Sequence, residues 1–527
     1  MSKLQEEITS RKTFAIISHP DAGKTTLTEK LLYFGGAIRE AGSVKGKKNT
    51  KHATSDWMEI EKQRGISVTS SVLEFHYKDH HINILDTPGH EDFSEDTYRT
   101  LTAADSATML IDAAKGVEAQ TEKLFKVCSM RGIPIFTFIN KLDREVRDPF
   151  ELMEEMEEIL GIRSYPMNWP IGMGQNFYGI YDRHSKKVEL FNSENPSDVE
   201  VKQTSGPEDP ILDELVDPSF LAQFREEIEL LDVAGDPYDE DKIFQGELTP
   251  VFFGSAISNF GVQNFLEHFL YFAPSPVGRE SDQGVVEPVQ DLFSGFIFKI
   301  QANMNPKHRD RIAFMRITSG KYTQGMNVNH VRLNKTMRLA QPTQFLAQDR
   351  SIVQEAYAGD IIGLFDPGTF RIGDTLAEKG TFQFAEMPHF SPEHFAAISV
   401  KDAMKHKSFE KGLQQLTEEG AIQLFHTYNR YPEQQIIGVV GELQFEVLEH
   451  RLKHEYKADI RMEHLPFSIA RWISGDTEEL EQFKKKQRNL AVDRDEKLVA
   501  LFDNEFQMNM AKEKYPNLVF HENSFIG

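Results

Sequence analysis

The sequence has very little cysteine and no long apolar run. Cys128 is the only cysteine among 527 residues, so the chain cannot form an internal disulfide, and we expect a reducing compartment. We interpret Cys128 as a small buried apolar residue. Residues 1–12 are charged and lack an apolar signal core, and no stretch is apolar for the length of a bilayer span. These features disfavour export and membrane insertion and predict a cytoplasmic protein without a membrane partner.

Positive charge is also scarce. Lys and Arg number 59 against 82 Asp and Glu, and the net charge of −23 disfavours non-specific binding to nucleic acid. Any RNA contact must therefore be local. Basic clusters at 307–311, 401–411 and 484–488 are each interpreted as solvated faces. Apolar residues make up 39% and charged residues 27%, the balance of a globular protein, and the length predicts about three or four domains.

The first half of the chain alternates short apolar runs with longer amphipathic stretches. This pattern predicts an α/β domain at 1–273 with a mostly parallel sheet, in which ligands bind beyond the carboxyl ends of the strands. An acidic stretch at about 144–249, interrupted by prolines, is interpreted as an insertion into this domain. The expected strands are Phe14–Ile17, Ile82–Leu85, Thr108–Ile111, Ile133–Ile139 and Pro250–Phe253.

Two further domains are expected after a proline-containing linker at 273–276. Short β-rich runs broken by glycines predict a small antiparallel β-barrel at 274–387. Residues 388–527 are expected to form an α+β domain that begins with a split βαβ plait. Beyond residue 467 further strands and helices are expected, including a helix at 478–487, but the pattern predicts no fold. The elements of the plait are expected at 395–400, 408–419, 422–428, 435–440, 443–454 and 458–462.

The first expected strand runs directly into a loop that ends in Gly-Lys-Thr. Phosphate oxygens need converging donors, and backbone N–H groups at a helix N-terminus supply them. Lys24 is expected to reach the β- and γ-phosphates of a nucleotide, and the Thr25 hydroxyl to bind Mg²⁺. Ser18 stands where a glycine is usual, so the loop must turn without it. The predicted phosphate loop comprises Ser18, His19, Pro20, Asp21, Ala22, Gly23, Lys24, Thr25 and Thr26.

A second motif follows the strand at 82–85 and comprises Asp86, Thr87, Pro88, Gly89 and His90. The Asp86 carboxylate can hold Mg²⁺ through a water molecule, and Gly89 allows its N–H to approach the γ-phosphate. Taken alone, the motif could be an ordinary turn. Its position after the phosphate loop favours a sensor of the third phosphate.

The nucleotide base is expected to be selected by Asn140, Lys141 and Asp143, which end the fourth strand. A carboxylate accepts the paired N1–H and exocyclic amine of guanine, whereas adenine offers neither donor in that geometry, so Asp143 predicts GTP and GDP rather than ATP. After the fifth strand, a backbone N–H and a serine hydroxyl could reach the guanine carbonyl. The residues there are Ser255, Ala256 and Ile257. They indicate a guanine site only because they follow the other motifs in this order.

Residues 64–69 lie between the phosphate loop and the second motif, where a switch segment is expected to close over Mg²⁺. Ser67 or Thr69 could supply the hydroxyl ligand, and Ser67 is the one we assign; the alternative is a loop leading into a strand at 72–77. A histidine group at 76, 80 and 81 is not interpreted as a metal site, because no carboxylate or thiolate stands in ligand spacing.

These motifs, in this order, resemble the translational GTPases. The resemblance covers nearly the whole chain and is most specific in the first domain. The stretch at 441–446 resembles a segment in the third domain of elongation factor G, and 293–299 and 314–325 resemble that factor's second-domain barrel. The motifs of the first domain that carry the resemblance are Ser18–Thr25, Arg64–Thr69, Asp86–His90 and Asn140–Asp143.

The resemblance also implies roles for single residues. His90 matches the catalytic residue that positions the attacking water, and in relatives the RNA of the large ribosomal subunit orients it, so hydrolysis is slow until docking. Pro20 and Ile66 match the apolar gate around that histidine. Ser67 stands where most relatives have threonine, so its match as a metal ligand is imperfect.

Among the translational GTPases, the chain is most similar to those that act in termination. This implies use of GTP on the ribosome, in contact with large-subunit RNA and ribosomal proteins, to detach class-one release factors after peptide release. Another ribosome-associated GTPase, similar to elongation factor G or to the ribosomal protection proteins, is the alternative, although nothing after the plait resembles an elongated tip domain. A nucleotide bound only as a structural ligand and an ATP-dependent enzyme are two further hypotheses.

Overall fold

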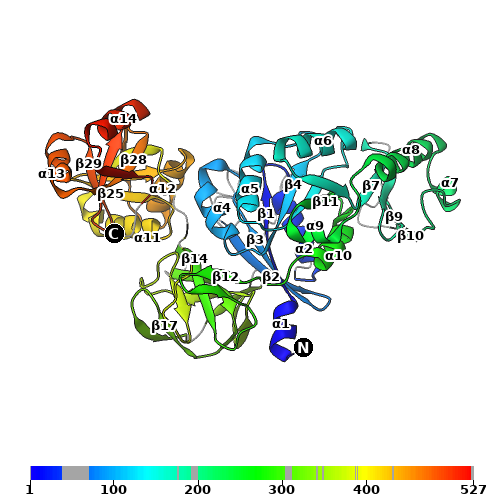
Figure 1. Ribbon diagram of the computed structural model, residues 1–527, viewed down its shortest axis with the longest axis horizontal. Helices are drawn as coiled ribbons and strands as arrows, with labels where there is room; N and C mark the ends of the chain where they lie inside the picture. Colours follow the sequence, from blue (N-terminus) through cyan, green and yellow to red (C-terminus); the bar gives the residue numbers. More distant parts are fainter. Residues whose placement is uncertain are drawn as a thin grey trace.

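The computed structural model describes residues 2–37, 70–174, 177–191, 200–302, 311–339, 342–346, 349–385, 387, 390–429 and 433–523. The chain forms three lobes that follow one another along the sequence (Figure 1). Within these residues, no helix has the length and apolar character that crossing a membrane requires.

The first lobe is built on a mixed sheet whose strand order is β2-β3-β1-β4-β5-β11-β6. β2 runs antiparallel to β3, and the other neighbours in this part of the sheet are parallel. All five strands expected from the sequence are present, so the α/β prediction for this domain is confirmed. The strand bounds are β1 Arg11–Ser18, β2 Ser71–Tyr77, β3 His80–Asp86, β4 Ser106–Asp112, β5 Ile135–Asn140, β6 Arg163–Pro166 and β11 Leu248–Phe253.

Helices cover both faces of this sheet because alternate residues of the buried strands face opposite sides. Phe14 of β1 belongs to the core that contains α2 and α10, whereas Ala15 belongs to the core that contains α4, α5 and α6. α1 precedes the sheet. The helix bounds are α1 Lys3–Thr9, α2 Lys24–Phe34, η1 Glu91–Phe93, α4 Ser94–Leu101, α5 Ala119–Met130, α6 Pro149–Leu160 and α10 Val262–Phe272.

The acidic segment expected as an insertion contributes to two sheets. Its strand β6 pairs parallel with β11 and so extends the main sheet. Its helix α6 lies among the helices of the main sheet, and its helix at Glu240–Gln245 contacts β11. An antiparallel four-stranded sheet and the helices at 211–215 and 218–234 lie at the end of the first lobe that faces away from the C-terminal lobe (Figure 1). The elements of the segment after β6 are β7 Asn168–Ile171, β8 Gly179–Asp182, β9 Lys187–Leu190, β10 Glu200–Gln203, α7 Ile211–Leu215, α8 Pro218–Ala234 and α9 Glu240–Gln245.

The second lobe is antiparallel and barrel-like, as the sequence predicts, and consists of one curled sheet and two separate two-stranded sheets. The curled sheet is continuous with the sheet of the first lobe, because β19 pairs with β2 at Leu346 and Glu74. Its strands are β12 Arg279–Ser281, β13 Gly284–Val286, β14 Ser294–Ala302, β15 Arg311–Ser319, β16 Lys321–Thr323, β17 Asn327–His330, β18 Lys335–Arg338, β19 Thr343–Leu346, β20 Asp349–Ile352, β21 Glu355–Tyr357, β22 Ile361–Phe365 and β23 Thr375–Ala377.

The third lobe contains the expected plait and an extension of its sheet. The strand order β27-β24-β26-β25 is that of a split βαβ unit, and β29, β30, β28 and β31 continue it into one eight-stranded sheet. The elements are β24 His394–Val400, η3 Ala403–Lys405, α11 His406–Glu418, β25 Gln423–Thr427, β26 Gln435–Val439, α12 Leu443–His454, β27 Ile460–Leu465, β28 Ile469–Gly475, α13 Thr477–Lys486, β29 Leu490–Asp493, β30 Leu498–Phe502, α14 Glu505–Lys514 and β31 Leu518–His521.

Candidate nucleotide-binding site

The predicted phosphate loop joins β1 to the N-terminus of α2. Its backbone turns through left-handed conformations at Asp21 (φ 67°) and Gly23 (φ 102°). A Cβ atom at Gly23 would also collide with the side chain of Asn140, so glycine is required there by both conformation and space. Because α2 begins at Lys24, the unpaired N–H groups of its first turn lie beside the loop, the arrangement that binds phosphate.

Ser18 starts the loop in place of the usual glycine. Its side chain is 1% exposed, and its Oγ has no hydrogen-bond partner within the part of the chain that the structure describes. A buried hydroxyl without a hydrogen-bond partner lowers the stability of the fold. Such unpaired groups are found in loops that surround a polar ligand.

The loop beginning at Asp86 lies directly against the phosphate loop. Asp86 ends β3 beside Ile16 of β1, and its carboxylate forms an ion pair with Lys24, both side chains being buried. Thr87 Oγ1 donates to the Ile16 carbonyl at 2.7 Å. A Cβ at Gly89 would lie 3.3 Å from the Pro20 nitrogen, so the two loops are in close contact.

His90 follows this loop and begins the turn into η1. Its side chain is 37% exposed, and its Nδ1 lies 3.3 Å from the Asp92 carboxylate and accepts from the Asp92 N–H at 3.3 Å. Asp92 in turn accepts a hydrogen bond from the Leu443 N–H at 2.7 Å. The 441–446 segment of the third lobe therefore contacts the chain two residues after His90.

The end of β5 and the residue after it connect three neighbouring loops. Asn140 Nδ2 donates to the Ala22 carbonyl at 2.8 Å, and its Oδ1 accepts from the Ala256 N–H at 2.8 Å. Lys141 Nζ donates to Asp112 at 2.6 Å. Asn140 thus connects the phosphate loop to the loop after β11.

Asp143 lies next to the last predicted loop. Its Oδ1 accepts from the Ser255 hydroxyl at 2.6 Å, which brings the expected base-reading carboxylate together with the serine of the loop after β11. The Ala256 side chain is fully buried, whereas Ile257 is 53% exposed. The two loops are therefore joined at one edge of the sheet, and Ile257 presents its side chain to solvent.

The structure brings most of the predicted site residues to one sheet edge, beyond the carboxyl ends of β1, β3, β5 and β11. Ser67, with the rest of the 64–69 segment, lies outside the described residues. The sequence motifs did not indicate two residues that support the site, Asp112, which ends β4, and Asp92. The signal for Asp112 was its place immediately after an expected strand at the same edge.

Three families match consecutive parts of the chain. Residues 9–275 match the elongation factor Tu GTP binding domain, 292–379 match elongation factor G domain 2, and 384–512 match the class II release factor RF3 C-terminal domain. A crystal structure of a Thermus thermophilus protein covers 89% of this chain and 71% of its own, with a TM-score of 0.70 and 22% identity, and supports the fold alone. Fold and site together define a translational GTPase.

Relatives that match over nearly their full length indicate which family of translational GTPases this is. The peptide chain release factor 3 of Symbiobacterium thermophilum is 59% identical over 521 residues, which is 99% of both chains. That of Staphylococcus aureus strain USA300 / TCH1516 is 56% identical over 522 residues, 98% of both chains. The chain belongs to the peptide chain release factor 3 family and is a GTPase of translation termination that interacts with the ribosome.

Proposed function

We propose that this chain uses GTP hydrolysis on the ribosome to detach class-one release factors after the peptide has been freed. The observation that carries the proposal is the identity of 59% to a peptide chain release factor 3 over 99% of both chains. The ribosome partners are the large-subunit RNA and ribosomal proteins, and the compartment is the cytoplasm. The single cysteine and the ordinary globular composition agree with that compartment.

In this proposal the units of the molecule are 1–273, with an insertion at about 144–249, then 274–387 and 388–527. The family matches at 9–275, 292–379 and 384–512 support this division, because their limits fall close to the same boundaries. The first unit binds and hydrolyses the nucleotide. The other two connect its state to the ribosome.

Phosphates and Mg²⁺ are proposed to bind between the phosphate loop and the loop at 86–90. The oxygen donors there, Thr25 and Asp86, are of the kind that Mg²⁺ prefers, and Ser67 is the proposed third donor. The ion pair between Asp86 and Lys24 supports this assignment, because it places a buried carboxylate and an ammonium group at the first turn of α2. When bound, Mg²⁺ neutralises phosphate charge. The chain's own contributions are the backbone N–H groups of the loop and the Lys24 ammonium.

The guanine base is proposed to bind at Asp143. The Ser255 hydroxyl donates to Asp143 Oδ1, and the exposed Arg144 guanidinium lies 3.7 Å from Oδ2, a contact that the guanine donors would replace. Asp143→Asn should move the preference from GTP toward xanthosine triphosphate, whose additional carbonyl needs a donor. Competition binding of the three nucleotides, with ATP as the negative control, measures this. A variant that still prefers GTP would remove Asp143 from the base pocket.

His90 is proposed to position the attacking water. Its partly exposed ring beside the Asp86–Gly89 loop supports this, because the ring is available for orientation by the ribosome. His90→Ala should keep GTP affinity close to wild type and lower ribosome-stimulated turnover by a factor of roughly 10² or more. His80→Ala, on β3 outside the loops, is the matched control. Equal turnover in both variants would exclude His90 from the mechanism and favour a purely structural nucleotide.

The decisive experiment measures two quantities in one mixture. GTP hydrolysis is followed with and without ribosomes, and dissociation of a labelled class-one release factor from termination complexes is followed alongside it. We expect both to depend on this chain and on GTP. Stimulated hydrolysis with unchanged release-factor dissociation would refute the proposed task while leaving the GTPase activity intact.

A further inference from the structure

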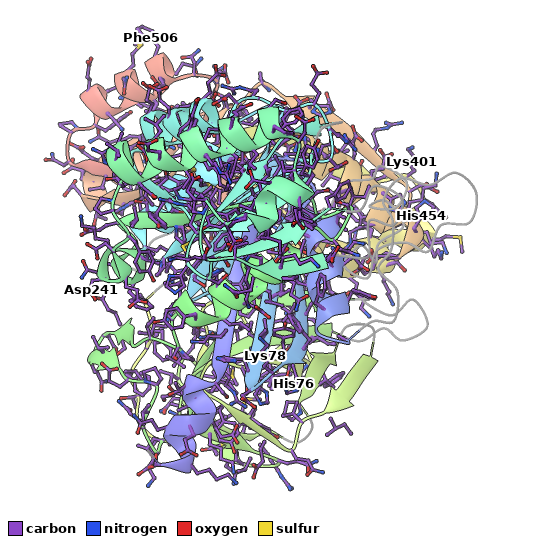
Figure 2. The ribbon with its side chains drawn as sticks, turned by 90° about the vertical axis from the view of Figure 1, so that its right-hand side faces the viewer. His76, Lys78, Asp241, Lys401, His454 and Phe506 are labelled. Carbon is purple, nitrogen blue, oxygen red and sulfur yellow. The ribbon has the colours of Figure 1, made fainter. Side chains whose placement is uncertain are left out.

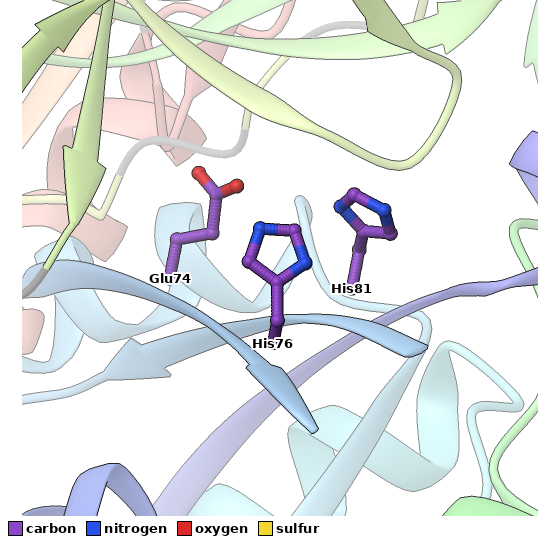
Figure 3. Close-up of side chains that lie close together, drawn as sticks. All are labelled: Glu74, His76 and His81. Carbon is purple, nitrogen blue, oxygen red and sulfur yellow. The ribbon is translucent and has the colours of Figure 1, made fainter. Parts of the chain in front are cut away.

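A second cluster of chemically reactive side chains lies on the β2–β3 hairpin, away from the nucleotide loops. His76 and His81 are direct cross-strand partners, and Glu74 is two residues before His76. Because side chains alternate along a strand, residues two apart share a face with the cross-strand partner. Figure 3 shows all three side chains projecting to the same side of the hairpin.

The three side chains are close enough to share one ion. One potential ligand atom from each of Glu74, His76 and His81 lies within 4.8 Å of the other two. The two imidazole rings meet edge to face with their centroids 4.1 Å apart. Bonds of about 2.0–2.1 Å to a tetrahedral metal place two ligand atoms roughly 3.3 Å apart, so a modest side-chain rotation closes the cluster. His76, which is exposed, has the freedom to make it.

The three side chains of the cluster differ in their exposure to solvent. Glu74 is 2% exposed, His81 is partly buried and His76 is exposed, so an ion can enter from the side of His76. This gives a buried carboxylate at the base of the cluster and two nitrogen donors above it. Two histidines and one glutamate, with water in the fourth position, form a ligand set that proteins use for zinc.

The charges around the cluster are compatible with a cation. Arg11, the basic group that most affects His81, is itself paired with Asp360 at 2.7 Å and with Glu7 at 3.0 Å.

We propose that Glu74, His76 and His81 bind one divalent first-row transition-metal ion. The ion is independent of the Mg²⁺ that accompanies GTP, because its nitrogen ligands suit softer metals and its residues lie outside the four nucleotide loops. Glu74 is also the residue through which β2 pairs with β19 of the second lobe. The bound ion would therefore fix the hairpin register where the first and second lobes join.

The test is a titration of the metal-free full chain with Zn²⁺, in competition with a chromophoric chelator. Excess Mg²⁺ and GDP keep the nucleotide site occupied. Burial raises the pKa of the Cys128 thiol to about 12, so that thiol does not compete as a thiolate. We expect one equivalent of Zn²⁺ to bind, and the same equivalent of Co²⁺ to give the visible absorption of a tetrahedral site.

Matched variants separate this cluster from other histidines. His76→Gln and His81→Gln should each lower the Zn²⁺ affinity by a factor of about 10² or more, as expected when a ligand is lost. His80→Gln removes a neighbouring histidine on the opposite face of the hairpin and should leave affinity unchanged. His454→Gln disrupts another close pair, His450 and His454, whose ring centroids are 4.3 Å apart on α12. Figure 2 shows that His454 lies far from His76.

The outcomes decide the proposal. Loss of the tight equivalent in the His76 variant, with GDP affinity retained, supports it even when His81→Gln folds poorly, because His76 is exposed. The proposal is overturned when wild type and His76→Gln bind Zn²⁺ equally. It is also overturned when only His454→Gln abolishes the tight equivalent, since the ion would then bind on α12.

Discussion

Replacing Asn140 by alanine tests whether the nucleotide loops form one cooperative unit. The side chain is 2% exposed and makes two hydrogen bonds of 2.8 Å, one to the Ala22 carbonyl and one from the Ala256 N–H. Ala22 is 1% exposed and Ala256 is fully buried, so water does not replace the lost partner easily. Each buried polar group left without a partner costs about 1–3 kcal/mol, and the two together cost about 2–6 kcal/mol.

The cost should appear mainly in nucleotide binding. In the free protein the phosphate loop of Asn140→Ala can shift to reach solvent, but it must return to its native position to bind phosphate. Even the lower bound of about 2 kcal/mol corresponds to an increase of about 30-fold in the dissociation constant for GDP. Equilibrium titration with a fluorescent GDP analogue, together with its dissociation rate, measures this change.

Gln444 offers a matched control for Asn140→Ala in the third lobe. Its amide also bridges backbone groups, accepting from Val440 and Gly441 at 2.9 and 3.0 Å and donating to Ala421 at 3.1 Å. Gln444→Ala should lower stability to urea by a similar amount without changing GDP affinity. If Asn140→Ala binds GDP within about threefold of wild type, the reasoning that the loops depend on this bridge is wrong.

Three further predictions concern contacts outside the nucleotide loops. Asp92→Ala removes a charge-assisted acceptor worth about 1.5–3 kcal/mol, so amide exchange at Leu443 should accelerate about 10- to 150-fold, and unchanged exchange would contradict the contact. Burial and neighbouring carboxylates raise the pKa of Glu189 from 4.5 to about 7. Protonated Glu189 therefore stabilises the folded state fully below pH 4.5, and this stabilisation is lost as the pH rises through 7. Glu189→Gln should therefore raise the free energy of unfolding by about 1–3 kcal/mol at pH 8 but not at pH 4, and equal effects at both would refute this. Arg451→Met removes the ion-pair partner that lies 2.6 Å from the Glu419 carboxylate, whose side chain is 5% exposed. The variant should lower the free energy of unfolding by about 3–5 kcal/mol, and a loss under about 1 kcal/mol would show that the pair is dispensable.

Local pattern accounted for much of the fold. The helix at Leu443–His454 was predicted to the residue, and the expected strand at Phe395–Val400 differs from β24 by one residue. The sheet formed after residue 467 was not predicted. Its strands are joined to the plait through β25 and β29, whose paired residues Phe425 and Asp493 are far apart in sequence. Strand pairing between residues so far apart in sequence depends on the assembled sheet. The local periodicity of apolar residues therefore does not predict it.

The candidate sites show the same limit. The motif order was sufficient to name Asn140 and Asp143, but it gave no sign that Asn140 joins two loops through its amide. The histidine group was set aside because no carboxylate was recognised in ligand spacing. That argument overlooked Glu74, since the relevant spacing on a strand is two residues and the second histidine comes from across the hairpin.

The same hairpin and the helix after His90 connect nucleotide chemistry to the other lobes. Ser70, the residue before β2, donates its N–H to Asp96 of α4 at 2.8 Å, and Lys299 of the second lobe lies 3.5 Å from that carboxylate. Asp92, just before α4, is held by Leu443 of the third lobe. A movement of the loop at 86–90 that displaces α4 must therefore break or carry contacts with both other lobes. These partly buried contacts have discrete partners, so they favour switching between two arrangements over gradual deformation.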